Sequence, residues 1–412
     1  ALSASHRAPG GGAGGGQAAR CGGPATSAAP PMTVGGADGD EDEDTPVWEP
    51  ACKVGDDDLK AVGAAFRAVA CGSDLVVAAS SRPVVKVWKV AQAKLADLQK
   101  LSHGAVGSSC VEVSGNGSLL LACTDDGAIP LWDIRDRRLV GELQASIPTA
   151  WTAKFLADGC RIASAGPSGS VCFWDLRMQR LETEIAANLP AKEEPDPKRH
   201  KRDKGSRGQP DLGSRRQAIG VYSLSLSGNG RLLACGRSNG DVSLMRVEDQ
   251  EWVGDVSAHQ SEGTSPVRAL AFDSASRLLL SGGDDCHVCL LDAASLARRR
   301  PGPPGLSTES ASAKLERFSA HRSWVTSLSV CPDATRRVVL TTSWDTTVKL
   351  WDYRTQRQLR TYKEHAESVF CSAFQPADGH FFVSAGADAH VALYVAKERG
   401  NEAALVPVGA PS

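Results

Sequence analysis

The sequence predicts an all-β protein, a seven-bladed β-propeller, and three observations carry this prediction. Short apolar strands that end in Trp-Asp, or in a close variant, recur along the chain about every 43 residues. Two further strands precede each of them, with turns containing Asn-Gly or Asp-Gly, the strongest short hairpin signals. Seven such units are present, and since one blade cannot bury both of its faces, the units must stack around an axis.

The spacing of the recurring strand defines the unit. Trp88, Trp132 and Trp174 are 44 and 42 residues apart, and Trp351 and Tyr394 are 43 apart. A four-stranded blade takes roughly 40–45 residues, so the spacing matches one blade per unit. The seven strands are VKVWKV (85–90), IPLWDI (129–134), VCFWDL (171–176), VSLMRV (242–247), VCLLDA (288–293), VKLWDY (348–353) and VALYVA (391–396).

Two spacings are longer than one blade. Trp174 and Met245 are 71 residues apart, and Leu291 and Trp351 are 60 apart. The excess is contained in segments 188–215 and 294–313, which are polar, rich in Pro and Gly and without apolar periodicity. We predict two surface insertions there. The basic run KRHKRDK (198–204) in the first insertion is interpreted as a solvated loop, in preference to a nuclear import signal or an RNA contact.

The ends of the chain lie outside the repeats. Residues 1–46 are first rich in Gly, Ala and Pro and then acidic (DGDEDED), which predicts a disordered extension. For residues 1–31 two interpretations stay open, a part of the mature chain or a leader that precedes Met32. The propeller is predicted over 47–396, closed by a strand in PVWEPACKV (46–54), and followed by a tail at 397–412.

Composition excludes several classes of function. A net charge of −2 provides no basic field for nucleic acid or anionic membrane, and no apolar run is long enough to span a bilayer, so we expect a soluble protein. The cysteines are scattered through apolar strands, which favours small buried thiols in a reducing compartment over a disulfide framework. These cysteines are Cys110, Cys123, Cys160, Cys172, Cys235, Cys331 and Cys371. No cofactor, metal site or catalytic motif is predicted, and the Cys-x-x-Cys at 286–289 is not expected to chelate, since residues three apart on a strand face opposite sides.

The units resemble WD-repeat propellers, a family in which a His, an Asp, a Ser or Thr and the Trp form a hydrogen-bonded cluster. The resemblance implies that one such cluster stabilises each blade, because a buried indole N–H and the polar groups of the turn need partners. One copy per blade argues against a catalytic triad. The implied cluster residues are His103, Asp126 and Trp132, then His321, Asp345 and Trp351, and finally His365 and Asp388 with Tyr394 in the place of Trp.

In this fold the residues that enter the first strand of each blade surround the central opening. Aromatic residues and Arg at such positions have the composition of a binding surface, although packing in the core is an equal alternative for each of them. We therefore predict a partner-binding site. Its candidate residues are Trp151, Tyr222, Arg268, Trp324, Trp344 and Phe370.

The succession of units resembles one family more narrowly, the WD-repeat subunits of the superkiller (Ski) complex. The third unit begins IPTAWTAKFLADG without Gly-His, and the sixth reads AHRSWVTSLSVCPDATRRVVLTTSWDTTVKLWD. The resemblance implies a non-catalytic scaffold that binds a tetratricopeptide-repeat protein and an RNA helicase, supporting 3′-to-5′ mRNA decay by the exosome in the cytoplasm. It also implies a nuclear relative in the polymerase-associated factor complex. Two alternatives are a WD-repeat adaptor in a chromatin or signalling complex and, from another class, a propeller hydrolase.

Overall fold

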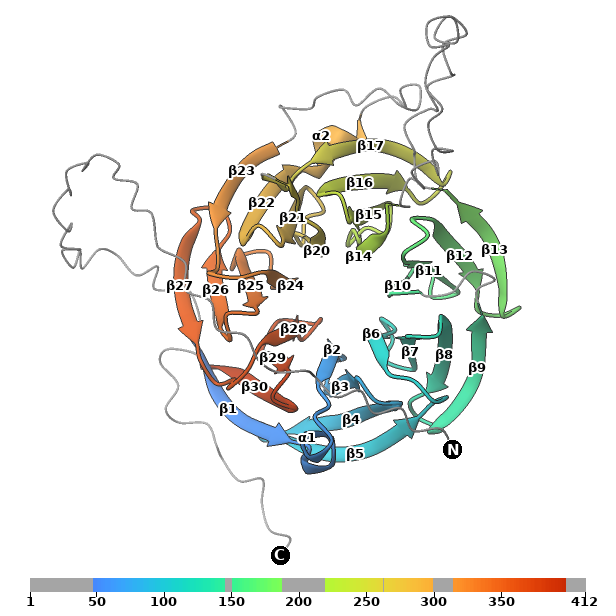
Figure 1. The fold of residues 1–412 in the computed structure, drawn as a ribbon, viewed down its shortest axis with the longest axis vertical. Coiled ribbons are helices and arrows are strands. Elements are labelled where there is room, and N and C mark those ends of the chain that lie inside the picture. The colour runs from blue at the N-terminus through green and yellow to red at the C-terminus, as the bar shows by residue number, and fades with distance from the viewer. Residues whose placement is uncertain (1–46, 145–149, 187–218, 262, 299–313, 398–412) are drawn as a thin grey trace, which may run out of the picture. The chain divides into compact units, whose positions relative to one another are not determined.

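Seven four-stranded antiparallel sheets surround a central opening, as Figure 1 shows. The structure is a computed structural model, and it describes residues 47–144, 150–186, 219–261, 263–298 and 314–397. The predicted seven-bladed β-propeller is confirmed.

The first four blades follow one another along the chain. In each, the strands pair in sequence order from the channel outward. Blade 1 contains β2 (Phe66–Cys71), β3 (Leu75–Ser80), β4 (Val84–Ala91) and β5 (Lys94–Ser102). Blade 2 contains β6 (Ser108–Val113), β7 (Leu119–Thr124), β8 (Ala128–Asp133) and β9 (Arg138–Gln144). Blade 3 contains β10 (Thr152–Phe155), β11 (Arg161–Ala165), β12 (Val171–Asp175) and β13 (Arg180–Ile185). Blade 4 contains β14 (Val221–Leu226), β15 (Leu232–Arg237), β16 (Asp241–Arg246) and β17 (Glu251–Ser257).

Three blades complete the ring. Blade 5 contains β20 (Val267–Phe272), β21 (Leu278–Gly283), β22 (His287–Asp292) and β23 (Lys314–Ser319). Blade 6 contains β24 (Val325–Val330), β25 (Val338–Ser343), β26 (Val348–Asp352) and β27 (Arg357–Tyr362). Blade 7 contains β28 (Val369–Phe374), β29 (Phe381–Gly386), β30 (His390–Lys397) and, as its outer strand, β1 (Val47–Gly55). Two other strands, β18 (Gln260–Ser261) and β19 (Gly263–Thr264), pair with each other before blade 5.

The ring closes through the strand predicted for this purpose. β1 pairs antiparallel with β30 from Val47 opposite Lys397 to Gly55 opposite His390, so the first described strand lies beside the last (Figure 1). Its Trp48 is fully buried, and the indole Nε1 donates to the carbonyl oxygen of Gly379 at 3.0 Å. The edge that blade 7 would otherwise expose is therefore covered.

The apolar core lies between neighbouring blades. Trp88 of blade 1, for example, packs in one cluster with Val383 and Leu393 of blade 7. Since both faces of every sheet contact another blade, the second strand of each blade is almost wholly buried, as in β25.

One predicted insertion begins with packed structure. Segment 294–313 was predicted to be unpatterned, but α2 (Ala293–Ala297) occupies its start, and Leu296 is buried in the cluster between blades 4 and 5. That part of the prediction was wrong, because a helix of five residues is too short to show a periodicity. A second short helix, α1 (Asp57–Ala61), follows β1. The predicted extension 1–46, insertion 188–215, segment 299–313 and the tail beyond Lys397 lie outside the described residues.

Across the described ranges, none of the helices has the length and apolarity that a membrane crossing requires.

Candidate functional site

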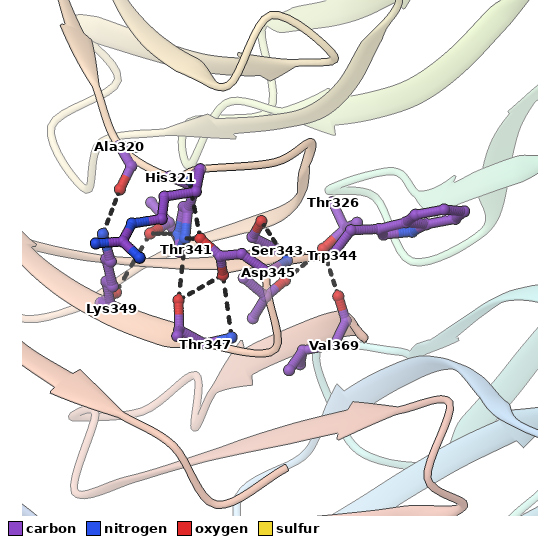
Figure 2. A network of polar contacts seen from close by, with 12 residues as sticks. Ala320, His321, Thr326, Thr341, Ser343, Trp344, Asp345, Thr347, Lys349 and Val369 are labelled. Carbon is purple, nitrogen blue, oxygen red and sulfur yellow. Dashed lines mark hydrogen bonds and ion pairs between the residues drawn. The ribbon is translucent and has the colours of Figure 1, made fainter. Parts of the chain in front are cut away.

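Blade 6 contains the complete hydrogen-bonded cluster. His321 hydrogen-bonds through Nδ1 to Asp345 at 2.9 Å and through Nε2 to the Thr341 hydroxyl at 2.7 Å, as drawn in Figure 2. The Trp351 indole donates to the same hydroxyl at 3.0 Å. Burial favours the neutral acid at Asp345, but hydrogen bonds from His321 and Thr347 outweigh it and hold the pKa of Asp345 well below its usual value. The cluster ties the turn before β24 to β25 and β26.

Blade 7 builds the same cluster with the predicted substitution. His365 bonds Asp388 at 3.0 Å and the Ser384 hydroxyl at 2.8 Å. The Ser384 hydroxyl lies 3.4 Å from the Tyr394 hydroxyl, which occupies the place of the Trp.

Blade 5 carries a third cluster that the sequence analysis missed. His259 bonds Asp285 at 2.9 Å and the Ser281 hydroxyl at 2.8 Å, and Arg317 also pairs with Asp285 at 3.0 Å. The predicted pattern includes a Trp on the third strand, whereas this blade has Leu291 there. The available signal was a His in AHQ followed 26 residues later by the second Asp of GGDD, close to the 24 residues that separate His321 from Asp345 in the sixth unit.

Blade 2 does not form the predicted cluster. His103 bonds the Ser108 hydroxyl at 2.8 Å, while Asp126 accepts from Thr124 instead of from His103. The reason is a missing hydroxyl. The register of β7 against Trp132 places Ala122 where blade 6 has Thr341, so nothing bridges the His to the Trp.

Each blade presents one residue of its innermost strand to the mouth of the channel. In six blades a β-bulge at the start of this strand turns that residue out of the ladder, which is a common way to re-aim a side chain beside a functional site. In blade 3, β10 begins directly after Trp151, which takes the same place. The seven residues, all of which line the channel of about 610 Å³, are Arg67, Ser109, Trp151, Tyr222, Arg268, Thr326 and Phe370.

The six candidate residues for partner binding form one continuous row, which we call the aromatic arc (Trp151, Tyr222, Arg268, Trp324, Trp344 and Phe370). The rings of Trp151 and Tyr222 have centroids 4.7 Å apart. The Arg268 guanidinium lies 5.3 Å from the Tyr222 ring centroid and 4.7 Å from that of Trp324. The Trp344 centroid follows at 4.5 Å from Trp324 and at 6.5 Å from Phe370. The arc therefore runs over blades 3 to 7 without interruption.

The arc is a surface and not a buried core. Trp344 is 45% exposed, and the other five side chains are partly exposed. Figure 2 shows Trp344 pointing away from the cluster around His321. Arg268 is held in place by Asp284, to which its Nη2 donates at 2.9 Å. An apolar surface with one fixed cation at its centre is suited to a peptide that carries apolar side chains.

Blades 1 and 2 give the channel mouth a different chemistry. Arg67 pairs with Asp125 at 2.7 Å, and both side chains are about two-fifths exposed. Beside them the Ser109 hydroxyl donates to the carbonyl oxygen of Trp151 at 3.0 Å. The mouth thus has an apolar arc on one side and a polar pair on the other.

The channel wall below the mouth holds a partly buried acid and a partly buried lysine. Glu112 and Lys154 are 3.4 Å apart, and burial raises the pKa of Glu112 to about 7 against the opposing charge of Lys154. Glu112 is the one carboxylate among the described residues that line the channel. No group of three or more His, Cys, Asp or Glu within the described ranges has the arrangement of a metal site.

Comparison with known proteins agrees with this geometry. The model of the WD domain, G-beta repeat, matches residues 97–133, 251–292, 312–352 and 356–394. An uncharacterized WD repeat-containing protein of Schizosaccharomyces pombe is 25% identical over 184 residues, which are 45% of this chain and 40% of that protein. The WD repeat-containing protein SL1-17 of Schistosoma mansoni is 24% identical over 205 residues, 50% of this chain and 57% of that protein. The chain thus spans about half the length of these relatives. The chain is therefore a seven-bladed β-propeller that contains WD repeats, an architecture typical of protein-interaction scaffolds.

Proposed function

We propose that this protein is a non-catalytic scaffold that binds an apolar peptide of a larger partner on the aromatic arc. The observation that carries the proposal is the continuity of the arc, in which six side chains from five blades contact one another around the channel mouth. Only 5% of the residues are Phe, Trp or Tyr, yet five of these aromatic side chains lie together on one surface. Exposed aromatic side chains of this kind supply much of the energy of peptide binding.

We further propose that the partner belongs to a Ski-type complex. The support is the resemblance of the third and sixth units to the WD-repeat subunits of that complex. The expected partners are a tetratricopeptide-repeat protein and an RNA helicase, with a role in exosome-dependent 3′-to-5′ mRNA decay. The same resemblance extends to the polymerase-associated factor complex, so we propose a cytoplasmic protein with a nuclear fraction.

An affinity purification of the full chain tests both levels of the proposal. The wild type should co-purify with a tetratricopeptide-repeat protein and a helicase, identified by mass spectrometry. Recovery of chromatin or signalling proteins instead would assign the chain to an adaptor of another complex. A propeller hydrolase would need acids that converge in the channel, where the described wall offers Glu112 paired with Lys154.

The binding surface is tested with two truncations and one matched control. Trp151→Ala and Trp344→Ala should each weaken binding by about 2–4 kcal/mol, roughly 30- to 1000-fold in Kd. The melting temperature should change by only a few degrees, since truncating an exposed side chain opens no core cavity. Leu139→Ala, at an exposed apolar residue on β9 outside the arc, should bind normally. Early melting of both tryptophan variants would mean that these residues belong to the core, and normal binding by both would mean that the partner docks elsewhere.

A further inference from the structure

The channel wall in blade 2 holds two cysteines that neither the blade cluster nor the aromatic arc uses. Cys110 on β6 and Cys123 on β7 are direct cross-strand partners. Directly opposed residues of an antiparallel pair have Cα atoms about 4.5–5.5 Å apart, which lies within the ~4.4–6.8 Å range that disulfides span. The register of β6 against β7 therefore places the two cysteines within the reach of a disulfide. The expectation of buried thiols was wrong for Cys110, Cys160 and Cys172, which are only partly buried.

The two thiols differ in access. Cys110 lines the channel, and its Sγ also contacts the carbonyl oxygen of Ala153 at 3.9 Å. Cys123 is fully buried among the apolar side chains between blades 2 and 3. A small reagent that diffuses into the channel reaches Cys110 first.

The two thiols also differ in charge. The neighbouring Cys123 thiol and the Lys154 ammonium lower the pKa of Cys110 below that of an ordinary thiol, against burial. The neighbouring Cys110 and burial raise the pKa of Cys123. Glu112 on β6 and Cys371 on β28 are the other titratable groups that interact with Cys110. Because the thiolate is the nucleophile in thiol chemistry, Cys110 is the cysteine that reacts first, and Cys123 is the resolving cysteine.

We propose that Cys110 and Cys123 form a peroxide-sensitive dithiol, which hydrogen peroxide entering the channel oxidises to a disulfide across β6 and β7. The Cys110 thiolate attacks one peroxide oxygen and breaks the O–O bond. It becomes a sulfenic acid, and the departing hydroxide takes up a proton to leave as water. The Cys123 sulfur, losing its proton, then attacks Cys110 Sγ and displaces the hydroxyl as a second water. Two thiols and one peroxide give one disulfide and two waters. This site is independent of which partner binds the aromatic arc.

The test is oxidation of the reduced full chain by a small excess of hydrogen peroxide, followed by alkylation, trypsin and mass spectrometry. Both cysteines fall in a single tryptic peptide, residues 101–135, which contains no other cysteine. We expect this peptide to become lighter by two hydrogen atoms. The internal control is Cys172, which is also partly exposed but whose pKa burial raises to about 11. Cys110 should react at least about tenfold faster than Cys172.

Two variants assign the roles. In Cys123→Ser, Cys110 should stop at the sulfenic acid and be trapped by a cyclic 1,3-diketone, while in Cys110→Ser, Cys123 should stay reduced. Circular dichroism shows whether each variant is folded. If a variant is unfolded, the comparison of Cys110 with Cys172 in the wild type still tests the proposal. Equal reaction rates of Cys110 and Cys172, or a peptide 101–135 that gains oxygen instead of losing hydrogen, would overturn the proposal.

Discussion

At the scale of single residues, His259 shows how a buried ion pair links the stability of this propeller to pH. The side chain is fully buried, and burial alone would favour its neutral form. The hydrogen bond with the Asp285 carboxylate, together with the nearby Cys289 sulfur, outweighs burial and raises the pKa of His259 to about 9. In the unfolded chain a histidine titrates near pH 6.5. The folded protein therefore holds a proton that the unfolded chain releases at neutral pH.

This difference predicts a loss of stability on the alkaline side. Because the pKa is higher in the folded state, the contribution of His259 is fully present below about pH 6.5 and is lost as the pH rises to about 9. We expect the free energy of unfolding to fall by roughly 1–3 kcal/mol over this range. Denaturant unfolding at pH 6.5 and pH 9 measures it.

The control for this prediction is His259→Gln, which keeps a hydrogen-bonding side chain but cannot titrate. Its unfolding free energy should be lower at pH 6.5 and should change less with pH than that of the wild type. Identical pH dependence in the two proteins would show that His259 does not carry the effect.

At the scale of the blade, one hydroxyl on the second strand connects the members of the cluster. Thr341 in blade 6 accepts from Trp351 and bonds His321, and Ser384 and Ser281 take this place in blades 7 and 5. The register against Trp88 places Ala78 there in blade 1. Accordingly, the buried Trp88 Nε1 has no hydrogen-bond partner among the described residues. An unpaired buried donor costs about 1–3 kcal/mol.

Ala78→Ser should therefore stabilise the protein. The new hydroxyl would stand where Thr341 meets Trp351 and would accept from Trp88, so we expect a gain of about 0.5–1.5 kcal/mol. Ala79→Ser is the matched control, since Ala79 is equally buried but faces the opposite side of β3, toward blade 2. There the hydroxyl should be unsatisfied and destabilising. Thermal unfolding of both variants checks the prediction, and a control as stable as Ala78→Ser would contradict it.

The same comparison shows what the sequence could predict of the blades. Their number, their strands and the closing strand follow from the period of the Trp-bearing strand and from alternating polarity, so these were predicted. The hydrogen-bonded clusters depend on residues whose identity the repeat period does not predict. His103, Asp126 and Trp132 match the pattern, but Ala122 lacks the hydroxyl that would connect them. His259 and Asp285 form a cluster although their blade has no Trp.

The Asp of the Trp-Asp pair also has a role that its pattern does not reveal. Asp352 accepts from the backbone N–H groups of Arg354 and Thr355 at 2.8 and 3.2 Å, and thereby holds the turn into the outer strand. Four of the candidate residues were predictable because the start of the innermost strand is a fixed position in a blade; these are Trp151, Tyr222, Arg268 and Phe370. Trp324 and Trp344 instead lie just before β24 and just after β25. Their mutual contacts, and the ion pair of Arg268 with Asp284, required the three-dimensional arrangement.

At the scale of the whole molecule, stability depends on closing the ring, and the closure joins residues more than 300 positions apart. β1 is the fourth strand of blade 7, although the other three come from the far end of the described chain. Besides its bond to Gly379, Trp48 packs its ring against Phe374 and Phe382, at centroid distances of 5.7 and 6.3 Å. Its own carbonyl oxygen accepts from the Tyr362 hydroxyl of blade 6 at 2.9 Å. Trp48 therefore joins the closing strand to two blades at once.

Trp48→Ala should destabilise the protein by about 3–5 kcal/mol, as expected when a fully buried tryptophan leaves a cavity and an unpaired carbonyl group in the apolar core. The measurement is chemical denaturation of the wild type and the variant. Trp252→Ala on β17 is the matched control, since this tryptophan is only partly buried and lies in the outer strand of a blade closed by its own chain segment. It should lose less stability.

Weakening the closure also frees the edge of β30, which can then pair with a second chain. We therefore expect light scattering during the unfolding of Trp48→Ala to rise with protein concentration. A variant that unfolds like the wild type and stays monomeric would show that the other six blades keep the ring closed without β1.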